Sequence, residues 1–241
     1  MLRFLSKHID RGSRNQYIGT CEIFHNRGLK VSVQLPVQTV SRLCLIYRVL
    51  LGMDRETLLS SSKLGKLVNI PAHTIRKDLS VAGKLKSSNA GYKAGELLDF
   101  IRELFRFDSP LRVCVAGIGL LGSSFIKNPV QEGGQFIIVA GFDTNINKIE
   151  VMKSDVPLFP AYEMADRIKE LKIDLGIIAV PAQAAEITMQ RMKEGGIKGI
   201  LNFSPAILGD KDIAVRNVHF AEELRFLTAM IPDLEKGVKN G

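Results

Sequence analysis

Apolar residues first recur at helical spacing just after Pro36, and they continue as a stripe to Leu51. Repeats of three and four residues place side chains on one face of a helix, so this segment predicts an amphipathic helix. The serines at 60–62 offer an N-cap for a short second helix that continues to Val68.

A third helix, AHTIRKDLSVA, is predicted to start at Pro71 and to stop at Gly83. The small and polar residues 84–95 are typical of a hairpin, and residues 96–105 predict another amphipathic helix. Two helices across a tight turn, followed by a hairpin, form the outline of a winged helix-turn-helix domain; an ordinary helical bundle is the alternative. Residues 1–34 show weak periodicity and predict a poorly ordered or separately docked extension.

The period of the apolar residues changes beyond residues 106–110, which we interpret as a hinge. Four continuous apolar runs predict strands at 111–116, 136–142, 175–180 and 199–203. Helical patterns lie between the runs, around 119–127, 161–171 and 183–194. Buried strands that alternate with amphipathic helices predict an α/β fold with a parallel sheet covered on both faces.

A glycine-rich loop, Gly117-Ile118-Gly119-Leu120-Leu121-Gly122, directly follows the first of these strands and opens a helix. In a Rossmann domain the three glycines allow a tight turn, a close approach of a diphosphate and close packing of helix on strand. Asp143 ends the next strand, where a carboxylate can bind a ribose 2′-hydroxyl and repel a 2′-phosphate. The pattern predicts NAD(H) binding in preference to NADP(H); a glycine-rich turn without a ligand is the alternative.

The ends of the next two strands are further candidates for the cofactor site. Val180 and Pro181 follow the third strand, and Asn202 and Phe203 lie at the end of the fourth. Ligands of open α/β sheets bind at the carboxyl ends of the strands, so we expect these residues beside the nicotinamide half. Alternatively, Pro181 and Pro205 merely end strands.

The distribution of charge separates the chain into a basic part and a weakly acidic part. Residues 1–107 hold 18 Lys and Arg against 8 Asp and Glu, whereas the remainder holds 15 against 17. Such asymmetry favours a polyanion-binding half joined to a half with another role, although a solvated basic surface would look the same. On the third helix, the candidates for contact with DNA are His73, Thr74, Arg76 and Lys77.

Composition excludes several classes of protein. Cys21, Cys44 and Cys114 are far apart and form no C-x-x-C pair, which argues against a disulfide framework and against a metal site. No apolar run reaches the length of a membrane span, and the charged N-terminus does not resemble a signal peptide. We therefore expect a soluble, cytoplasmic protein that does not associate with membranes.

A catalytic centre is not evident in the sequence. His219 is the sole histidine of the sheet domain, and no Ser/His/Asp or paired-carboxylate arrangement is apparent. An NAD-dependent oxidoreductase that uses His219 is an alternative, but a sensor is the simpler interpretation.

With these motifs in order, the chain resembles the Rex family of bacterial redox-sensing transcriptional repressors from about residue 36 to residue 231. The matching motifs are R-L-x-x-x-Y-R at 42–48, Ser61-Ser62, T-I-R-K-D-L-S at 74–80, Gly91-Tyr92, the glycine loop, Phe142-Asp143, A-V-P-A at 179–182, G-I-K-G-I-L-N-F-S-P at 196–205 and Glu223-Leu224.

The resemblance implies a homodimer that binds a palindromic operator in double-stranded DNA and leaves it when NADH binds. A C-terminal helix, here about 220–231, would be exchanged between subunits. The resemblance adds Ser61, Ser62 and Ser80 to the expected DNA contacts. In the wing, the family's basic pair is replaced by Ser87-Ser88, and Lys84 and Lys86 lie nearby.

A polar switch of the family is altered in this chain. The family links an Arg of the first helix to a Tyr after the glycine-loop helix and to an Asp before the C-terminal helix. Arg48 matches the first, but Asn128 and His219 stand at the other two positions. A divergent paralogue with weak or lost redox coupling is therefore the second hypothesis.

The expected organisation follows from these assignments. We expect a basic extension (1–35), a winged-helix DNA-binding domain (36–107), a Rossmann NAD(H)-binding domain (108–219) and a C-terminal dimerisation helix and tail (220–241).

Overall fold

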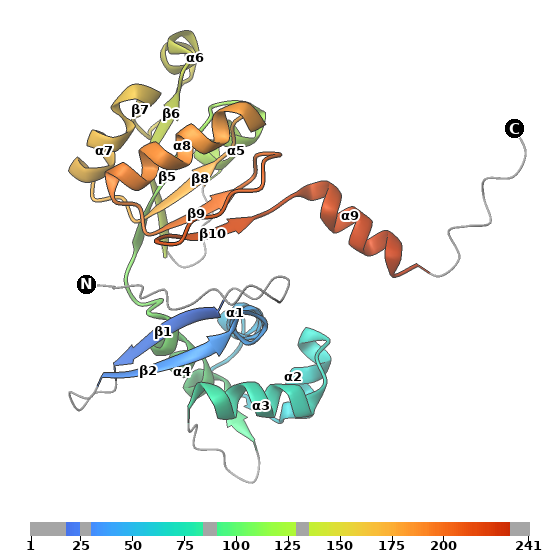
Figure 1. The fold of residues 1–241 in the computed structure, drawn as a ribbon. Helices are drawn as coiled ribbons and strands as arrows, with labels where there is room; N and C mark the ends of the chain where they lie inside the picture. Colours follow the sequence, from blue (N-terminus) through green and yellow to red (C-terminus); the bar gives the residue numbers. More distant parts are fainter. Residues whose placement is uncertain (1–17, 25–29, 84–90, 129–134, 232–241) are drawn as a thin grey trace, which may run out of the picture. The chain divides into compact units, whose positions relative to one another are not determined.

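The computed structural model describes residues 18–24, 30–83, 91–128 and 135–231, with side chains from Leu35 onward. The chain divides into two compact units, Met1–Ser109 and Pro110–Gly241 (Figure 1). We describe each unit by itself.

The first unit is a helical domain with two small antiparallel sheets. Its core is formed by buried side chains of all four helices, among them Leu43, Leu64, Ile75 and Ile101. The described elements are β1 (Ile18–Phe24), β2 (Lys30–Pro36), α1 (Val37–Leu51), β3 (Leu58–Leu59), α2 (Ser61–Val68), α3 (Ala72–Ala82), β4 (Tyr92–Lys93) and α4 (Ala94–Phe105).

The helix boundaries of this unit follow from local chemistry. Ser60 caps α2, because its Oγ accepts a hydrogen bond from the Lys63 N–H at 3.1 Å. Asn69 ends α2 in the left-handed conformation, with φ of 54°. Pro71 precedes α3, and Gly83 ends it. The helix-turn-helix expected from the sequence is therefore present as α2 and α3.

The strands β1 and β2 differ from the expectation of a poorly ordered or separately docked extension. They pair antiparallel, with Ile18 opposite Pro36 and Phe24 opposite Lys30. A two-stranded sheet is marginal alone, but β2 runs directly into α1 and its Leu35 is fully buried in the core of the unit. The end of the expected extension is thus continuous with the helical domain.

The expected hairpin at 84–95 is described in part, since residues 84–90 lie outside the described ranges. Strand β4 pairs antiparallel with β3, with Leu59 opposite Tyr92. Gly91 has φ of 111°, and a Cβ there would collide with the backbone of Leu59. Helix α4 begins at Ala94, so the last two residues of the expected hairpin are helical.

The second unit is a Rossmann-type α/β domain, as expected. Its six strands form a parallel sheet in the order β10-β9-β8-β5-β6-β7. The elements are β5 (Leu111–Ala116), α5 (Leu120–Lys127), β6 (Phe136–Asp143), α6 (Ile146–Val151), β7 (Leu158–Pro160), η1 (Ala161–Glu163), α7 (Met164–Glu170), β8 (Leu175–Ile178), α8 (Ala182–Gly195), β9 (Gly199–Asn202), β10 (Ala214–Asn217) and α9 (Phe220–Ala229).

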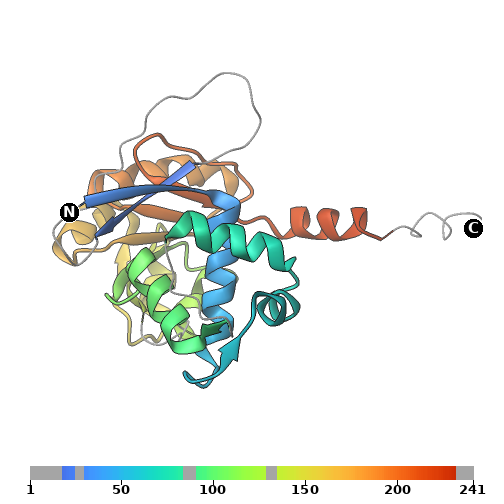
Figure 2. The same ribbon diagram turned by 90° about the horizontal axis from the view of Figure 1, so that it is seen from below.

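Helices cover both faces of this sheet (Figure 2). Along β5, Cys114 belongs to the core shared with α7 and α8, whereas Val115 belongs to the core shared with α5. Successive residues of a strand point to opposite faces, so two apolar cores form, one on each side. The sequence pattern missed α6, β7 and β10, each of six residues or fewer.

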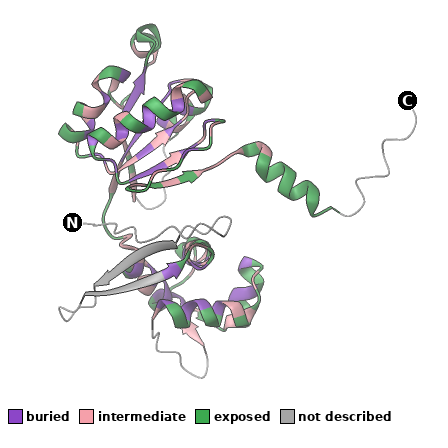
Figure 3. Ribbon diagram, in the orientation of Figure 1, coloured by how far each residue is buried: buried purple, intermediate pink, exposed green. Residues whose placement is uncertain are grey.

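Helix α9 extends away from the sheet and is exposed over almost its whole length (Figure 3). None of its residues is buried, and its exposed large apolar side chains include Phe220, Leu224, Phe226 and Leu227. Its bounds match the expected C-terminal helix; the exchange of this helix between subunits stays a prediction.

The connection between the units is shorter than the hinge expected at 106–110. Arg106 ends α4 in the left-handed conformation, with φ of 55°. The Phe107 ring packs against Tyr47 and Phe105, with ring centroids 4.9 and 5.5 Å apart. These contacts belong to the first unit, which leaves residues 108–110 as the exposed connection.

Candidate functional site

The loop between β5 and α5 requires glycine at two positions for reasons of packing. Gly117 has φ of 95°, and a Cβ there would overlap the carbonyl oxygen of Ala179. A Cβ on Gly122 would overlap the carbonyl oxygen of Gly117. The tight turn and the close packing of helix on strand are therefore both present.

Gly119 differs from the other two glycines, because a Cβ there would meet no atom within 4 Å. Gly119 is also the N-cap of α5, and no side chain caps this helix end. Open space beside the N-terminus of a helix is what a bound diphosphate requires, since the backbone N–H groups and the helix dipole favour an anion. The loop thus fits the diphosphate of a dinucleotide.

Leu120 and Leu121 begin α5, and both side chains are exposed. Their backbone N–H groups, rather than their side chains, lie in the first turn of the helix. These two residues would therefore meet a diphosphate through the main chain.

Asp143 ends β6 beside the glycine loop and is buried. Its Oδ2 accepts a hydrogen bond from the Ile118 N–H at 2.7 Å, and its Oδ1 accepts one from the Asn145 N–H at 2.8 Å. The Lys148 Nζ lies 3.5 Å from Oδ2. A carboxylate has about four acceptor positions, so contact with a ribose stays possible in addition to this role in holding the loop.

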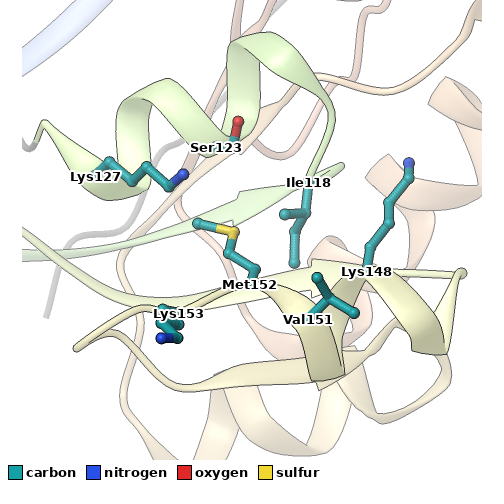
Figure 4. Close-up of a pocket in the computed structure, with 7 residues that line it drawn as sticks. All are labelled: Ile118, Ser123, Lys127, Lys148, Val151, Met152 and Lys153. Atoms are coloured by element: carbon teal, nitrogen blue, oxygen red, sulfur yellow. The ribbon is translucent and has the colours of Figure 1, made fainter.

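A pocket of about 500 Å³ lies between α5 and α6 (Figure 4). Ile118, Val151 and Met152 give it apolar surface, and Ser123 adds a hydroxyl from α5. Three basic side chains complete the lining, those of Lys127, Lys148 and Lys153. Apolar surface beside Asp143 with a cationic rim suits an adenosine that carries phosphate groups.

The sequence did not indicate this pocket beyond Ile118. Helix α6 is a six-residue element without a buried residue, so it lacks the apolar stripe by which helices are recognised. Lys148 follows Asp143 by five residues, and this spacing could have indicated a basic side chain near the site.

On the other side of the glycine loop lie the ends of β8 and β9. A Cβ on Gly117 would lie 2.9 Å from Val180 Cγ1, so Val180 borders the loop directly. Pro181 is exposed at the N-cap of α8. The Phe203 ring packs against Phe125 of α5, with centroids 5.2 Å apart. The structure therefore brings the ends of β8 and β9 to the glycine loop and its helix.

Asn202 has a different position from the one expected of a ligand contact. It is fully buried, and its Nδ2 donates to the carbonyl oxygen of Ala206 at 2.7 Å and to Asn217 Oδ1 at 2.8 Å. Its Oδ1 accepts a hydrogen bond from the Ser204 N–H at 3.0 Å. The side chain holds the loop after β9, and direct contact with a cofactor stays a prediction.

The candidate DNA-binding surface lies on α2 and α3. The side chains of Arg76 and Lys77 are exposed, as are those of Ser62, His73 and Ser80. Thr74 and Ser61 are half-buried. Arg76 Nη1 donates a hydrogen bond to Ser61 Oγ at 2.9 Å, which holds the guanidinium between the two helices. Lys84 and Lys86 lie outside the described residues.

An ion pair behind this surface fixes α3 to α1. Arg42 binds the Asp78 carboxylate with two nitrogens, at 2.6 and 2.8 Å, and Thr39 Oγ1 donates to the same carboxylate at 2.8 Å. Asp78 is 3% exposed. The hydrogen bond to Asp78 raises the pKa of Arg42, so the guanidinium stays charged. Motif residues on the two helices thus set the position of the recognition helix.

The three expected switch residues do not contact one another within either unit. Arg48 is exposed on α1, in the first unit. Asn128 ends α5, and its Nδ2 donates to the carbonyl oxygen of Ser124 at 3.3 Å. His219 precedes α9, and its Nδ1 is buried without a hydrogen-bond partner.

Other chemistry is sparse in the described ranges. Burial raises the pKa of the Cys114 thiol to about 12, so this thiol stays protonated and unreactive at neutral pH. The described side chains form no group of three or more His, Cys, Asp or Glu that could hold a metal ion. Within the same ranges, no helix is both long enough and apolar enough to cross a membrane.

Two family models match the chain. The model described as "CoA binding domain" matches residues 108–206, which include the glycine loop and Asp143. The model described as "Putative DNA-binding protein N-terminus" matches residues 34–80, which include α1, α2 and most of α3.

Among the curated relatives that match most of the chain are two redox-sensing transcriptional repressors called Rex. The protein of Limosilactobacillus reuteri is 33% identical over 201 residues, covering 82% of this chain and 94% of the relative. The protein of Listeria welshimeri is 30% identical over 202 residues, covering 83% and 94% respectively.

Solved structures of a Rex-family repressor named RSP are similar to most of this chain. The crystal structure of RSP in complex with β-NAD⁺ and operator DNA has a TM-score of 0.74 at 27% identity, covering 81% of this chain and 92% of RSP. The structure of RSP in complex with β-NADH has a TM-score of 0.71 at 27% identity, covering 81% and 93% respectively.

Proposed function

Because the chain belongs to the Rex family of redox-sensing transcriptional repressors, we propose that it binds operator DNA through α2 and α3 and releases it when NADH binds the Rossmann unit. The chain is a regulator of transcription rather than an enzyme. Its cofactor is NAD(H), in oxidised and reduced forms that the protein distinguishes.

The open space at Gly119 is the observation that carries the cofactor half of this proposal. Gly117 and Gly122 are needed for packing, whereas glycine at 119 leaves a place that a Cβ would fill. Such a cradle at the N-terminus of α5 fits a diphosphate. The adenosine would lie toward Asp143 and the nicotinamide toward Val180, Pro181 and Phe203.

The DNA half of the proposal rests on the exposed cations of α3. Arg76 and Lys77 would read base edges, and His73, Thr74, Ser61, Ser62 and Ser80 would contact the backbone or bases of the operator. Lys84 and Lys86 would add phosphate contacts from the wing. We propose that the protein acts in the bacterial cytoplasm, where its operator is found.

A homodimer is part of this proposal. Helix α9 presents unpaired apolar side chains along its length, and a second copy of the chain would bury them. Two copies would also place two recognition helices on the half-sites of a palindromic operator.

The test is a titration of operator affinity against the NADH/NAD⁺ ratio at a fixed salt concentration, because phosphate contacts make affinity steeply dependent on salt. The proposal expects tight binding without ligand or with NAD⁺, and release as NADH rises. Operator binding that ignores the ratio contradicts redox sensing and leaves a DNA-binding protein with another signal.

A repressor with weakened redox coupling is the second candidate, favoured by Asn128 and His219 at the altered switch positions. The same titration separates the two candidates. Binding of both ligands to the protein without an effect of NADH on operator affinity supports the second.

A further inference from the structure

Unpaired buried polar atoms mark the carboxyl edge of the sheet. Among the described residues, three such side-chain atoms lack a hydrogen-bond partner, namely Gln135 Nε2, Ser204 Oγ and His219 Nδ1. Asn202 of β9 pairs with Asn217 of β10, and Ser204 and His219 each lie two residues beyond these paired positions. Two of the three atoms therefore lie at neighbouring strand ends, at the edge where open α/β sheets bind ligands.

The backbone of Ser204 is fixed although its hydroxyl is not paired. Its N–H donates to Asn202 Oδ1, and the preceding Phe203 N–H donates to the carbonyl oxygen of Ile178 at 2.8 Å. The side chain is part of a residue that is 3% exposed. Burying a hydroxyl without a partner costs free energy, so its presence here calls for a group that pairs with it.

The order of the strands determines which part of a dinucleotide reaches this place. The diphosphate lies at the loop after β5, and Asp143 places the adenosine on the side of β6. The other half of the molecule then extends over β8 and β9, toward Phe203 and Ser204. The contact of Phe203 with Phe125 shows that this loop lies against the helix that would hold the diphosphate.

We propose that Ser204 Oγ, which is covered in the ligand-free protein, becomes uncovered when the cofactor binds and forms a hydrogen bond with the carboxamide of the nicotinamide ring. The proposal rests on the NAD(H) binding proposed above. The carboxamide is the sole hydrogen-bonding group of the reduced ring's substituents, and it both donates and accepts, as a serine hydroxyl does. His219 is not part of the contact, because β10 lies one strand further from the glycine loop.

The test compares NADH with ADP-ribose, which keeps both riboses and the diphosphate but lacks the nicotinamide. Their affinities are measured by calorimetry for the wild-type protein and for Ser204→Ala. We expect the Kd for NADH to rise about three- to tenfold, the loss of one hydrogen bond. The Kd for ADP-ribose should stay within about twofold, since the bond to the carboxamide is absent from that ligand.

Thermal unfolding of the ligand-free protein separates contact from a structural role. Removing an unpaired buried hydroxyl leaves the midpoint unchanged or raises it, whereas a lower midpoint and equal losses for both ligands would overturn the proposal. Unchanged NADH affinity would overturn it as well. The matched control is Ser124→Ala, an exposed serine of α5, which should alter neither affinity.

The failure of this proposal is distinct from a failure of the proposed function. Wild-type protein that binds neither NADH nor ADP-ribose contradicts NAD(H) binding itself. Wild-type protein that binds both, with no selective effect of Ser204→Ala, contradicts only the role of Ser204.

Discussion

Gly119 allows a test of the diphosphate site without loss of the fold. Because a Cβ at this position meets nothing within 4 Å, Gly119→Val should unfold at nearly the same temperature as the wild type. The valine would occupy the place of the diphosphate, so NADH binding should become undetectable by calorimetry while operator binding without ligand is retained. Retained NADH affinity would show that the cofactor lies elsewhere.

Gly122→Ala is the informative contrast to this variant. Its Cβ would overlap the Gly117 carbonyl oxygen, so it should lower the unfolding midpoint before any ligand is added. The two glycines therefore separate a requirement of packing from a requirement of binding.

Asp143 carries the prediction about cofactor preference. Asp143→Ala should weaken the binding of NADH, because the carboxylate no longer contacts the ribose. It should also reduce the preference for NADH over NADPH, because a negative charge that repels the 2′-phosphate is removed. It also removes the acceptors of the Ile118 and Asn145 N–H groups, so Asp143→Asn, which keeps one of the two acceptor oxygens, is the control. The measurement is the affinity of each variant for NADH and for NADPH. If neither affinity changes in Asp143→Ala, Asp143 does not contact the ribose.

At the scale of elements, α3 carries the prediction about reading DNA. Arg76→Ala should cost about 1–3 kcal/mol of operator binding and relax specificity at one base pair. Ser61→Ala should have a smaller effect of the same kind, since it releases the Arg76 guanidinium without removing its charge. The loss of affinity and the loss of specificity are both measured by titrating each variant with operators that differ at single base pairs. Equal losses on every sequence would assign Arg76 to a phosphate.

The wing provides the comparison for this experiment. Lys84→Ala should weaken binding to DNA of every sequence by a similar factor. It should also lower the salt dependence of binding, as the loss of a phosphate contact does. Replacing Ser87-Ser88 by Lys-Arg should tighten operator binding, and no gain would indicate that the wing docks differently in this chain.

The ion pair between α1 and α3 carries a prediction about stability. Asp78→Ala leaves Arg42 unpaired, and Arg42 is partly exposed, so we expect a loss of about 2–3 kcal/mol in the free energy of unfolding. Urea unfolding measures this loss. In a double-mutant cycle with Arg42→Ala, the second substitution should cost little once the first is made; additive losses would mean that the pair contributes little.

The elements that the sequence predicted correctly share a clear local pattern of apolar residues. The strands β5, β6, β8 and β9 are continuous apolar runs, and α1 and α8 are long amphipathic helices. The strands β3, β7 and β10 are two to four residues long and depend on partners distant in sequence, which no local pattern reveals. The strands β1 and β2 were missed because their register is also a property of the pair.

The part of the site that could be predicted from the sequence is the part where the backbone requires a particular residue type. Glycines at 117, 119 and 122 were recognised because no other residue fits a turn, a cradle and a close contact. Lys148 and Val151 line the pocket from a helix without a sequence signal. Asn202 was assigned to the ligand because strand ends carry ligands, but its hydrogen bonds to Ala206 and Asn217 could be seen only in three dimensions.

At the scale of the whole molecule, His219 carries the prediction about coupling. An Asp would hold Arg48 by a charge-assisted pair at all physiological pH values. A histidine cannot form that pair, because it carries no negative charge in either protonation state. The effect of NADH on operator affinity should therefore be weaker than with an Asp.

The matching experiment repeats the operator titration with His219→Asp combined with Asn128→Tyr. This double variant should strengthen the effect of NADH on operator affinity. Coupling that is already large and indifferent to both substitutions would show that the protein switches through other contacts.

The packing of Phe107 against Tyr47 leaves three residues to join the two units. Three residues span about 10 Å at most, even when fully extended. The pyrrolidine ring fixes the φ angle of Pro110, so most of the backbone rotation in this connection occurs at Asp108 and Ser109. Along the covalent chain, this short tether therefore limits how far the two units can move apart, whereas rotation about Asp108 and Ser109 stays available.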